Sequence, residues 1–131
     1  MRVLLVEDDA AEAEAVLRAL RASGPAVEVH RVGDGEEALD YLFCSGRHAA
    51  RDPAEQPALV VLDIRLPKVD GIELLRRMKG SHLKGIRVVV TASSREERDV
   101  LESYRLGVDA YLLKPLAREA VHDALAKLGF A

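Results

Sequence analysis

Residues 59–63 read Leu-Val-Val-Leu-Asp, a run of four apolar residues that ends on a carboxylate. Comparable runs stand at 3–6, 88–90 and 110–113, and a more alternating stretch covers 27–32. Short apolar runs rich in β-branched residues are typical of parallel strands that are covered on both faces. The sequence therefore predicts five strands in one sheet.

Segments with helical periodicity separate these runs and follow the last one. In each segment, apolar residues recur three and four positions apart, which gives a helix one face for the core. The core residues predicted in this way are Ala13, Val16, Leu17 and Leu20; Leu39, Leu42 and Phe43; Ile72, Leu75 and Met78; Val100, Leu101 and Tyr104; and Val121, Leu125 and Leu128. Strand followed by helix, five times over, predicts an α/β fold with a doubly wound, five-stranded parallel sheet.

Length and composition limit the possible functions. The 131 residues, 49% of them hydrophobic, suffice for a single domain over residues 1–131. The 19 basic and 22 acidic side chains are interspersed, which argues against binding to nucleic acid. The single cysteine, Cys44, cannot form an internal disulfide, and no apolar run approaches the ~20 residues that cross a bilayer. We therefore expect a cytoplasmic protein that binds neither nucleic acid nor membrane.

Polar residues stand where the predicted strands end. They are Glu7, Asp8 and Asp9 after the first strand, Asp63 at the end of the third, Thr91 at the end of the fourth, and Lys114 with Pro115 after the fifth. The carboxyl ends of parallel strands lie at one edge of a doubly wound sheet, where such folds bind ligands. Carboxylates, a hydroxyl and an ammonium gathered there would suit a hard divalent cation and a phosphoryl group.

A carboxylate can attack phosphorus when a metal ion neutralises the charge on the transferring oxygens. Asp63 could then be nucleophile and Mg²⁺ ligand at once, with Lys114 and Thr91 as partners of the phosphoryl oxygens. The four histidines lack the spacing of zinc ligands and are expected at the surface or on the edge of a strand. Each residue also has a purely structural explanation, since either Asp8 or Asp9 could cap the first helix and an aromatic such as Tyr111 is commonly a core residue.

Four ordered motifs resemble those of the response-regulator receiver family. They are Val6-Glu7-Asp8-Asp9, the stretch Leu-Asp-Ile-Arg-Leu-Pro-Lys-Val-Asp-Gly at 62–71, Val90-Thr91-Ala92, and Tyr111-Leu112-Leu113-Lys114-Pro115. The resemblance covers the whole chain. It implies a flavodoxin-like, CheY-like fold with strand order 2-1-3-4-5. It also implies a signalling switch that catalyses only its own phosphorylation and dephosphorylation, and not an enzyme.

The resemblance also implies a role for each site residue. Glu7, Asp8, Asp63 and the backbone carbonyl of Arg65 are similar to the family's Mg²⁺ ligands, and Asp63 to its phosphoacceptor. Thr91 is similar to the family's switch hydroxyl, Lys114 to its invariant lysine and Tyr111 to its rotating aromatic. Arg65 and Ser93 stand where the family tunes hydrolysis of the phosphoryl group. The Lys114–Pro115 peptide bond would be cis, which proline permits at modest cost.

Two features narrow the resemblance. The polar stretch from Arg47 to Gln56 is expected to be an exposed loop. This loop, with the stretches Ser94 to Ser103 and Leu106 to Asp109, is similar to the single-domain regulators that partner bacterial phytochromes. This implies a sensor histidine kinase of the phytochrome type as donor, and a homodimer formed through the fourth helix, fifth strand and fifth helix. Because the chain ends at Ala131, soon after the last predicted helix, we expect no output domain.

Three other functions are weighed against this one. A degenerate receiver would fold in the same way and act only as a protein-interaction module, but every charged position that the chemistry needs is present. A phosphatase of the haloacid-dehalogenase type would need an acid two residues after its nucleophile, where this chain has Arg65. A dinucleotide-binding domain would need glycines after the first strand, where acids stand instead.

Overall fold

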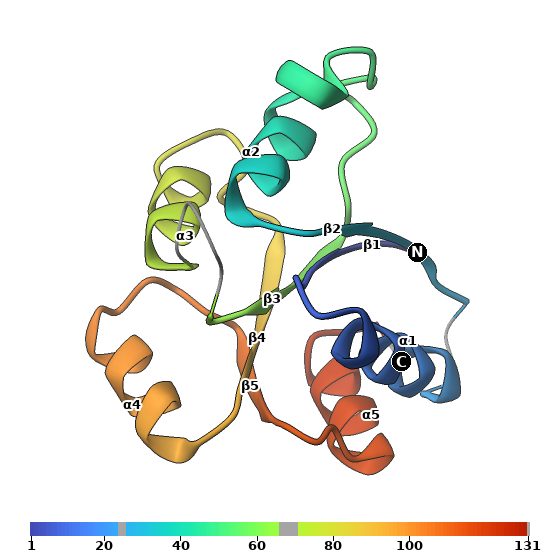
Figure 1. Cartoon of the computed structure of the whole chain (residues 1–131), viewed down its shortest axis with the longest axis vertical. Coiled ribbons are helices and arrows are strands. Elements are labelled where there is room, and N and C mark those ends of the chain that lie inside the picture. Colours follow the sequence, from blue (N-terminus) through green and yellow to red (C-terminus); the bar gives the residue numbers. More distant parts are fainter. Residues whose placement is uncertain (24–25, 66–70, 131) are drawn as a thin grey trace.

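The computed structural model describes residues 1–23, 26–65 and 71–130. They form a parallel sheet in the order β2-β1-β3-β4-β5, which confirms the predicted fold class and strand order. The strands are β1 (Arg2–Val6), β2 (Glu28–Val32), β3 (Leu59–Asp63), β4 (Arg87–Ala92) and β5 (Ala110–Leu113). The helices are α1 (Ala10–Ala22), α2 (Gly35–Phe43), α3 (Gly71–Lys79), α4 (Arg95–Ser103) and α5 (Arg118–Lys127). Helices α2, α3 and α4 cover one face of the sheet, and α1 and α5 cover the other (Figure 1).

The central strands send their side chains alternately into two apolar layers. Leu4 and Val60 belong to the layer beneath α2, α3 and α4, whereas their chain neighbours Val3 and Val61 belong to the layer beneath α1 and α5. All four side chains are buried. Both faces of β1 and β3 are therefore covered, which explains why the sequence shows uninterrupted apolar runs there. Strand β2 lies at the edge of the sheet and has exposed polar residues, which accounts for its alternating pattern.

The end of α2 departs from the prediction. Phe43, predicted as a core residue, is 37% exposed, and Tyr41 is buried instead. Phe43 is the last residue of α2, and its ring meets that of His82 edge-on at a centroid distance of 6.0 Å. Cys44 follows the helix, is half-buried and caps it in the left-handed conformation (φ 52°). The buried side of α2 is formed by Ala38, Leu39, Tyr41 and Leu42, and Phe43 lies outside it.

Helix α4 packs on the sheet through one buried residue. Leu101 is 1% exposed, whereas Val100 and Tyr104, also predicted as core residues, are 58% and 46% exposed. The Tyr104 ring lies 5.7 Å from the guanidinium carbon of Arg76 on α3. The prediction for Val100 and Tyr104 was wrong because helical spacing identifies an apolar stripe but not how much of it the sheet covers.

The stretch from Arg47 to Gln56 is mostly exposed, as predicted, but it begins in a short 3₁₀ helix, η1 (Gly46–His48). Arg51 fixes this stretch to α2, because its guanidinium donates to the carbonyl of Tyr41 and lies over the Tyr41 ring, 3.6 Å from the centroid. Gln56 Nε2 donates to the carbonyl of Leu42 at 2.9 Å. The loop is therefore held against the end of α2.

Two histidines that are distant in the sequence meet beside this loop. The His30 ring on β2 lies 4.6 Å from the ring of Tyr41 and 5.5 Å from that of His48, measured between centroids. His48 Nε2 is 3.1 Å from a carboxylate oxygen of Glu37. Burial lowers the pKa of His30, and the nearby His48 and Arg51 lower it further, while Glu37 acts in the opposite direction. Sequence spacing did not predict this cluster.

The lowered pKa of His30 predicts a pH dependence of stability. The unfolded chain protonates this histidine near its ordinary pKa of about 6.5, whereas the folded protein resists protonation until lower pH. Stability is therefore lost as pH falls from about 6.5 through the folded pKa. We expect the free energy of unfolding in urea to fall less steeply between about pH 7 and 5 in His30→Gln than in the unsubstituted protein. His82→Gln, outside the cluster, is the matched control, and equal slopes for the two variants would contradict the prediction.

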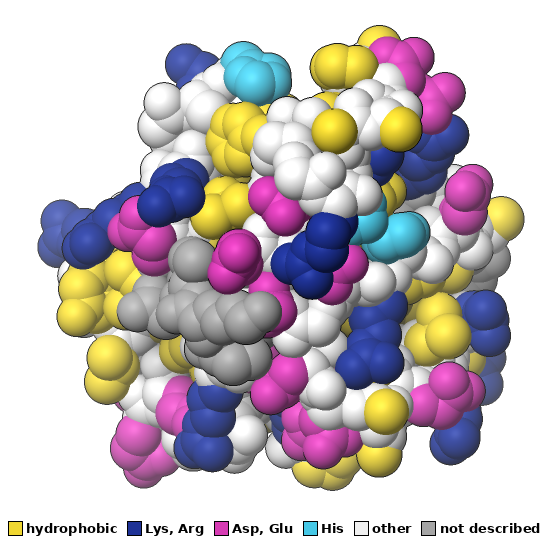
Figure 2. All heavy atoms as spheres, turned by 45° about the horizontal axis from the view of Figure 1, so that its top comes forward, with side chains coloured by type: hydrophobic (Ala, Val, Ile, Leu, Met, Phe, Trp, Pro, Cys, Tyr) yellow, Lys and Arg dark blue, Asp and Glu magenta, His cyan; other side chains and the backbone are white. Residues whose placement is uncertain are grey.

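The surface carries mixed charge. Acidic and basic side chains are interspersed over the face shown in Figure 2. Of the helices in the described ranges, none has the length and apolar character to cross a membrane.

Candidate functional site

The ends of four strands bring the predicted site residues to one edge of the sheet. Asp63 is the last residue of β3 and pairs in register with Thr91 on β4, while Glu7 follows β1 and Lys114 follows β5. Because β3 lies between β1 and β4, Asp63 takes the central place. Glu7, Asp63 and Thr91 are 1%, 5% and 1% exposed. Two carboxylates and a hydroxyl are thus buried together at the carboxyl edge.

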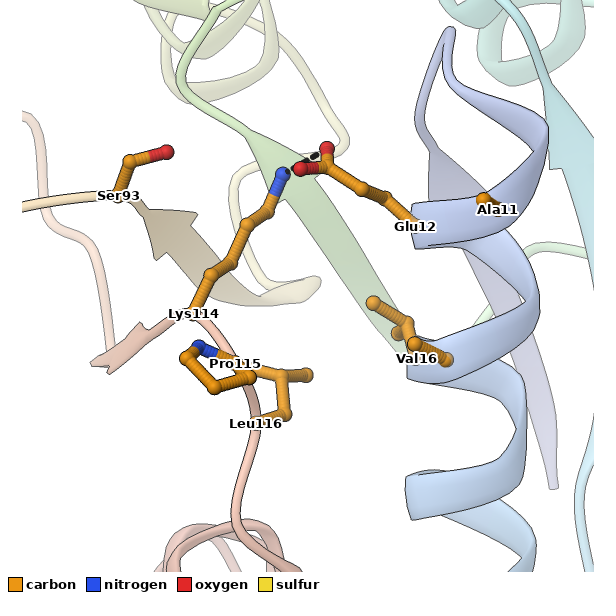
Figure 3. Close-up of a pocket in the computed structure, with 8 residues that line it drawn as sticks. Ala11, Glu12, Val16, Ser93, Lys114, Pro115 and Leu116 are labelled. Atoms are coloured by element: carbon orange, nitrogen blue, oxygen red, sulfur yellow. Dashed lines mark hydrogen bonds and ion pairs between the residues drawn. The ribbon is translucent and has the colours of Figure 1, made fainter.

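The Lys114 ammonium joins the carboxylates of this edge. Its Nζ lies 2.9 Å from Glu7 Oε1, 3.2 Å from Asp63 Oδ2 and 2.6 Å from Glu12 Oε2. Carboxylate oxygens of Glu7, Glu12 and Asp63 all lie within 4.8 Å of one another. Figure 3 shows the Lys114 and Glu12 side chains extending toward each other from the end of β5 and from α1. One cation therefore faces three carboxyl groups, and the excess of acidic groups would favour the binding of a divalent cation.

Burial and ion pairing together set the protonation of Glu7 and Lys114. Burial raises the pKa of Glu7 to about 7, and Asp63 adds to this effect while the Lys114 hydrogen bond opposes it. Burial would lower the pKa of Lys114, but hydrogen bonds to Glu12 and Glu7 and the charge of Asp63 outweigh it and hold the pKa above its usual range. Lys114 thus stays charged, and its hydrogen bond and charge favour the ionised form of Glu7.

Glu12 was missed by sequence reasoning. It lies in the first turn of α1, where its backbone N–H donates to Asp9 Oδ1 at 2.9 Å, so Asp9, one of the two candidate N-caps, is the cap. The cap fixes the start of α1 and places Glu12 over the sheet edge beside Lys114. An acid three residues after an N-cap was the available signal. That spacing alone is explained by capping and does not indicate a site.

Asp8 is placed differently from Glu7. Its side chain is exposed, and among the described residues the carboxylates gathered within 4.8 Å of one another do not include it. Arg31 holds the backbone here, because its guanidinium donates to the carbonyls of Glu7 at 3.0 Å and Asp8 at 3.1 Å. The structure therefore brings Glu7 to Asp63 and leaves the Asp8 carboxylate facing outward.

Arg65 and Ser93 border the same site. The backbone N–H of Arg65 donates to Asp63 Oδ1 at 3.1 Å, and its guanidinium is ion-paired with Glu97 at the start of α4. The backbone N–H of Ser93 donates to the same Glu97 carboxylate at 2.8 Å. Residues 66–70, which complete the second motif, lie outside the described residues. Glu97 is a further neighbour of the site that the sequence did not indicate.

Tyr111 and the lysine–proline pair complete the predicted set. Tyr111 lies in β5 opposite Val90, half-buried against the layer beneath α2, α3 and α4, and burial raises its pKa. The Lys114–Pro115 peptide bond is cis, as expected. Beside it, Figure 3 shows a hollow between α1 and the segment after β5, in which Val16 and Leu116 form part of an apolar wall and Lys114 stands at the polar end.

Comparison with known proteins agrees with this geometry. The family model described as "Response regulator receiver domain" matches residues 3–126. The probable methanogenesis regulatory protein FilR2 of Methanothrix harundinacea is 41% identical over 118 residues, which cover 89% of this chain and 74% of FilR2. Response regulator Rcp1 of Synechocystis is 39% identical over 113 residues, which cover 86% of this chain and 75% of Rcp1.

Three solved structures share the fold over nearly the whole chain. The bacteriophytochrome response regulator RtBRR is 46% identical, with a TM-score of 0.91 over 98% of this chain and 77% of its own. The Mn²⁺-bound form of Rcp1 is 35% identical, with a TM-score of 0.79 over 95% of this chain and 91% of its own. The phosphorylated cyanobacterial phytochrome response regulator RcpA is 37% identical, with a TM-score of 0.76 over 97% of this chain and 89% of its own.

Proposed function

The chain belongs to the response regulator receiver family, and from this premise we propose that residues 1–131 act as one receiver domain that accepts a phosphoryl group on Asp63 from a sensor histidine kinase. The domain is a signalling phosphoacceptor and not a conventional enzyme, since it acts only on its own phosphorylation and dephosphorylation. One observation carries the proposal: the charged Lys114 ammonium lies within 3.2 Å of Asp63, beside the buried Glu7, at the ligand-binding edge of the sheet.

The carboxylates at this edge fit a hard divalent cation. Glu7, Glu12 and Asp63 offer oxygens within 4.8 Å of one another, and Mg²⁺ prefers oxygen ligands. We assign Mg²⁺ to Glu7, Asp63, the backbone carbonyl of Arg65 and Asp8, whose exposed side chain would have to turn inward. Rcp1, whose structure is similar, binds Mn²⁺, a cation of related ligand preference.

In the proposed reaction an Asp63 oxygen forms a bond to phosphorus while the P–N bond of the donor phosphohistidine breaks, and the electron pair of that bond returns to the imidazole nitrogen. Mg²⁺, when bound, neutralises charge on the transferring oxygens. Lys114 keeps its proton and donates a hydrogen bond to one phosphoryl oxygen, and the Thr91 hydroxyl donates to another. The burial of Asp63 and Thr91 limits the access of water to the new acyl phosphate.

Labelling with a small phosphoramidate donor tests the proposal. We expect intact-mass spectrometry to show one added phosphoryl group per chain in the presence of Mg²⁺ and at least about tenfold slower labelling when the metal is chelated, because the Asp63 and Glu7 charges then repel the donor. A chain that stays unlabelled with saturating Mg²⁺ would favour the alternative function, a degenerate receiver that acts only as a protein-interaction module.

Phosphorylation would change the surface formed by α4, β5 and α5. In the proposed switch, Thr91 moves toward the phosphoryl group and the half-buried Tyr111 rotates, which shifts a population between two packings. Exposed apolar side chains of Val100, Tyr104 and Leu113 lie on or next to α4 and β5 and support a homodimer through this surface. Sedimentation with and without a beryllofluoride mimic tests the assembly.

The partner kinase is proposed to be of the phytochrome type. RtBRR and RcpA, whose structures are similar, are by name regulators of bacteriophytochrome and cyanobacterial phytochrome systems, and the chain covers most of each. Phosphotransfer from phytochrome-type and other histidine kinases to this chain, compared at short reaction times, tests this assignment.

A further inference from the structure

Glu97 connects α4 to both loops that border the phosphorylation site. Its carboxylate accepts from the backbone N–H of Ser93 at 2.8 Å and forms a two-pronged ion pair with the Nε and Nη2 groups of Arg65. Its own N–H donates to Ser94 Oγ at 3.2 Å, which fixes the start of the helix. The Glu97 side chain is 18% exposed, whereas that of Arg65 is 70% exposed. The carboxylate is therefore the fixed member of the pair and the guanidinium the movable one.

Both donors that Glu97 holds are near the proposed phosphoacceptor. Arg65 follows Asp63 by two residues and donates its backbone N–H to Asp63 Oδ1 at 3.1 Å. Ser93 follows Thr91, the register partner of Asp63, by two residues. The hydrogen bond from the Ser93 N–H lowers the pKa of Glu97 most, Arg65 lowers it further, and the charge of Lys114 also contributes.

A phosphoryl group on Asp63 would need cationic and N–H donors at this place. It brings about two negative charges and three acceptor oxygens. Lys114 is already shared among Glu7, Glu12 and Asp63. Beyond Lys114 and the Thr91 hydroxyl, the further donors that border the site are the Arg65 guanidinium and the Ser93 N–H, and the Glu97 carboxylate accepts hydrogen bonds from both.

We propose that Glu97 is a positioning residue that holds Arg65 and Ser93 in the unphosphorylated protein and gives them up to the phosphoryl group, so that phosphorylation releases the start of α4 from the loop after β3. This inference rests on the proposed function, since it requires Asp63 to be the acceptor. On this proposal the Arg65–Glu97 ion pair competes with phosphorylation, and the contacts at the start of α4 change when the phosphoryl group is added.

The test is a double-mutant cycle on the labelling rate with a small phosphoramidate and Mg²⁺. We expect Glu97→Gln to be labelled roughly two- to fivefold faster than the unsubstituted chain, the range that one exposed charge pair supplies. The gain should disappear in the Arg65→Met background, because Glu97 acts through Arg65. Glu96→Gln, on the same turn and exposed, removes an equal charge and is the control for long-range electrostatics. Circular dichroism confirms that each variant is folded.

A rate for Glu97→Gln equal to that of Glu96→Gln would overturn the inference, and so would a gain that persists undiminished with Arg65→Met. These results leave the proposed function standing, because the unsubstituted chain is still labelled on Asp63. Absence of label on the unsubstituted chain overturns both. Hydrogen exchange gives a second readout of the release of Ser93 from Glu97. In the unsubstituted chain, beryllofluoride should change the rate at which the Ser93 amide exchanges its hydrogen with solvent. This change should be smaller in Glu97→Gln.

Discussion

Asp63→Asn is expected to take up no phosphoryl group from a phosphoramidate donor, while the chain keeps its fold. An amide oxygen is a poor nucleophile, and the substitution changes almost no volume in a site where the side chain is buried. The fold is further favoured because Asp63 raises the pKa of the buried Glu7, so its removal relieves a repulsion. We therefore expect a free energy of unfolding at pH 7 that is equal to or above that of the unsubstituted chain.

Intact-mass spectrometry and urea unfolding measure the two effects on the same preparation. Asp99→Asn, an exposed acid on α4, is the matched control and should be labelled like the unsubstituted chain. Stoichiometric label on Asp63→Asn that survives at neutral pH would move the acceptor to another residue and end the assignment.

Lys114→Met has the second large effect, because it removes the cation that contacts Glu7, Glu12 and Asp63. Removing one partner of a buried ion pair costs about 3–5 kcal/mol, since the remaining charge is left without compensation. Lys114 lowers the pKa of Glu7, which burial has already raised to about 7. Without the lysine this pKa rises further, and the site gains stability only when Glu7 is protonated.

The free energy of unfolding of Lys114→Met is expected to depend on pH. A carboxyl whose folded pKa lies above its unfolded value contributes stability that is full below the unfolded pKa, here about 4.5, and is lost as pH rises through the folded pKa. The free energy of unfolding in urea should therefore fall further below that of the unsubstituted chain at about pH 8 than at about pH 5, and Mg²⁺ should recover part of this loss. Lys127→Met at the end of α5 is the control. A deficit independent of pH would show that Lys114 does not act through Glu7.

Much of the fold could be predicted from the sequence because the sheet is buried on both faces. The uninterrupted runs in β1 and β3 have one explanation in a domain of this size, and their ends located Asp63 and Glu7 correctly. Helical spacing was less informative. It could not indicate that α2 buries Tyr41 in place of Phe43.

The site was predicted as far as it depends on strand ends. Glu7, Asp63, Thr91 and Lys114 meet because parallel strands end at one edge, a property of the topology. Glu12 and Glu97 come from the first turns of helices, and their approach depends on how each helix is rotated over the sheet. The meeting of His30 with His48 likewise depends on the path of a loop, which no local spacing encodes.

Helix α4 has a single apolar attachment, Leu101, and this shapes how the molecule can respond. Pulling a large side chain out of a core costs about 1.5–3 kcal/mol, so a helix with three or four such side chains would resist any movement that a phosphoryl group could drive. A helix with one can tilt about that residue while keeping it covered. In the proposed switch, the loss of the Glu97 contact at the start of α4 would then move the exposed Val100 and Tyr104 to new positions. Of the five α-helices that the structure describes, α4 has the fewest buried residues and is therefore the one that can move at the lowest cost in buried apolar contacts.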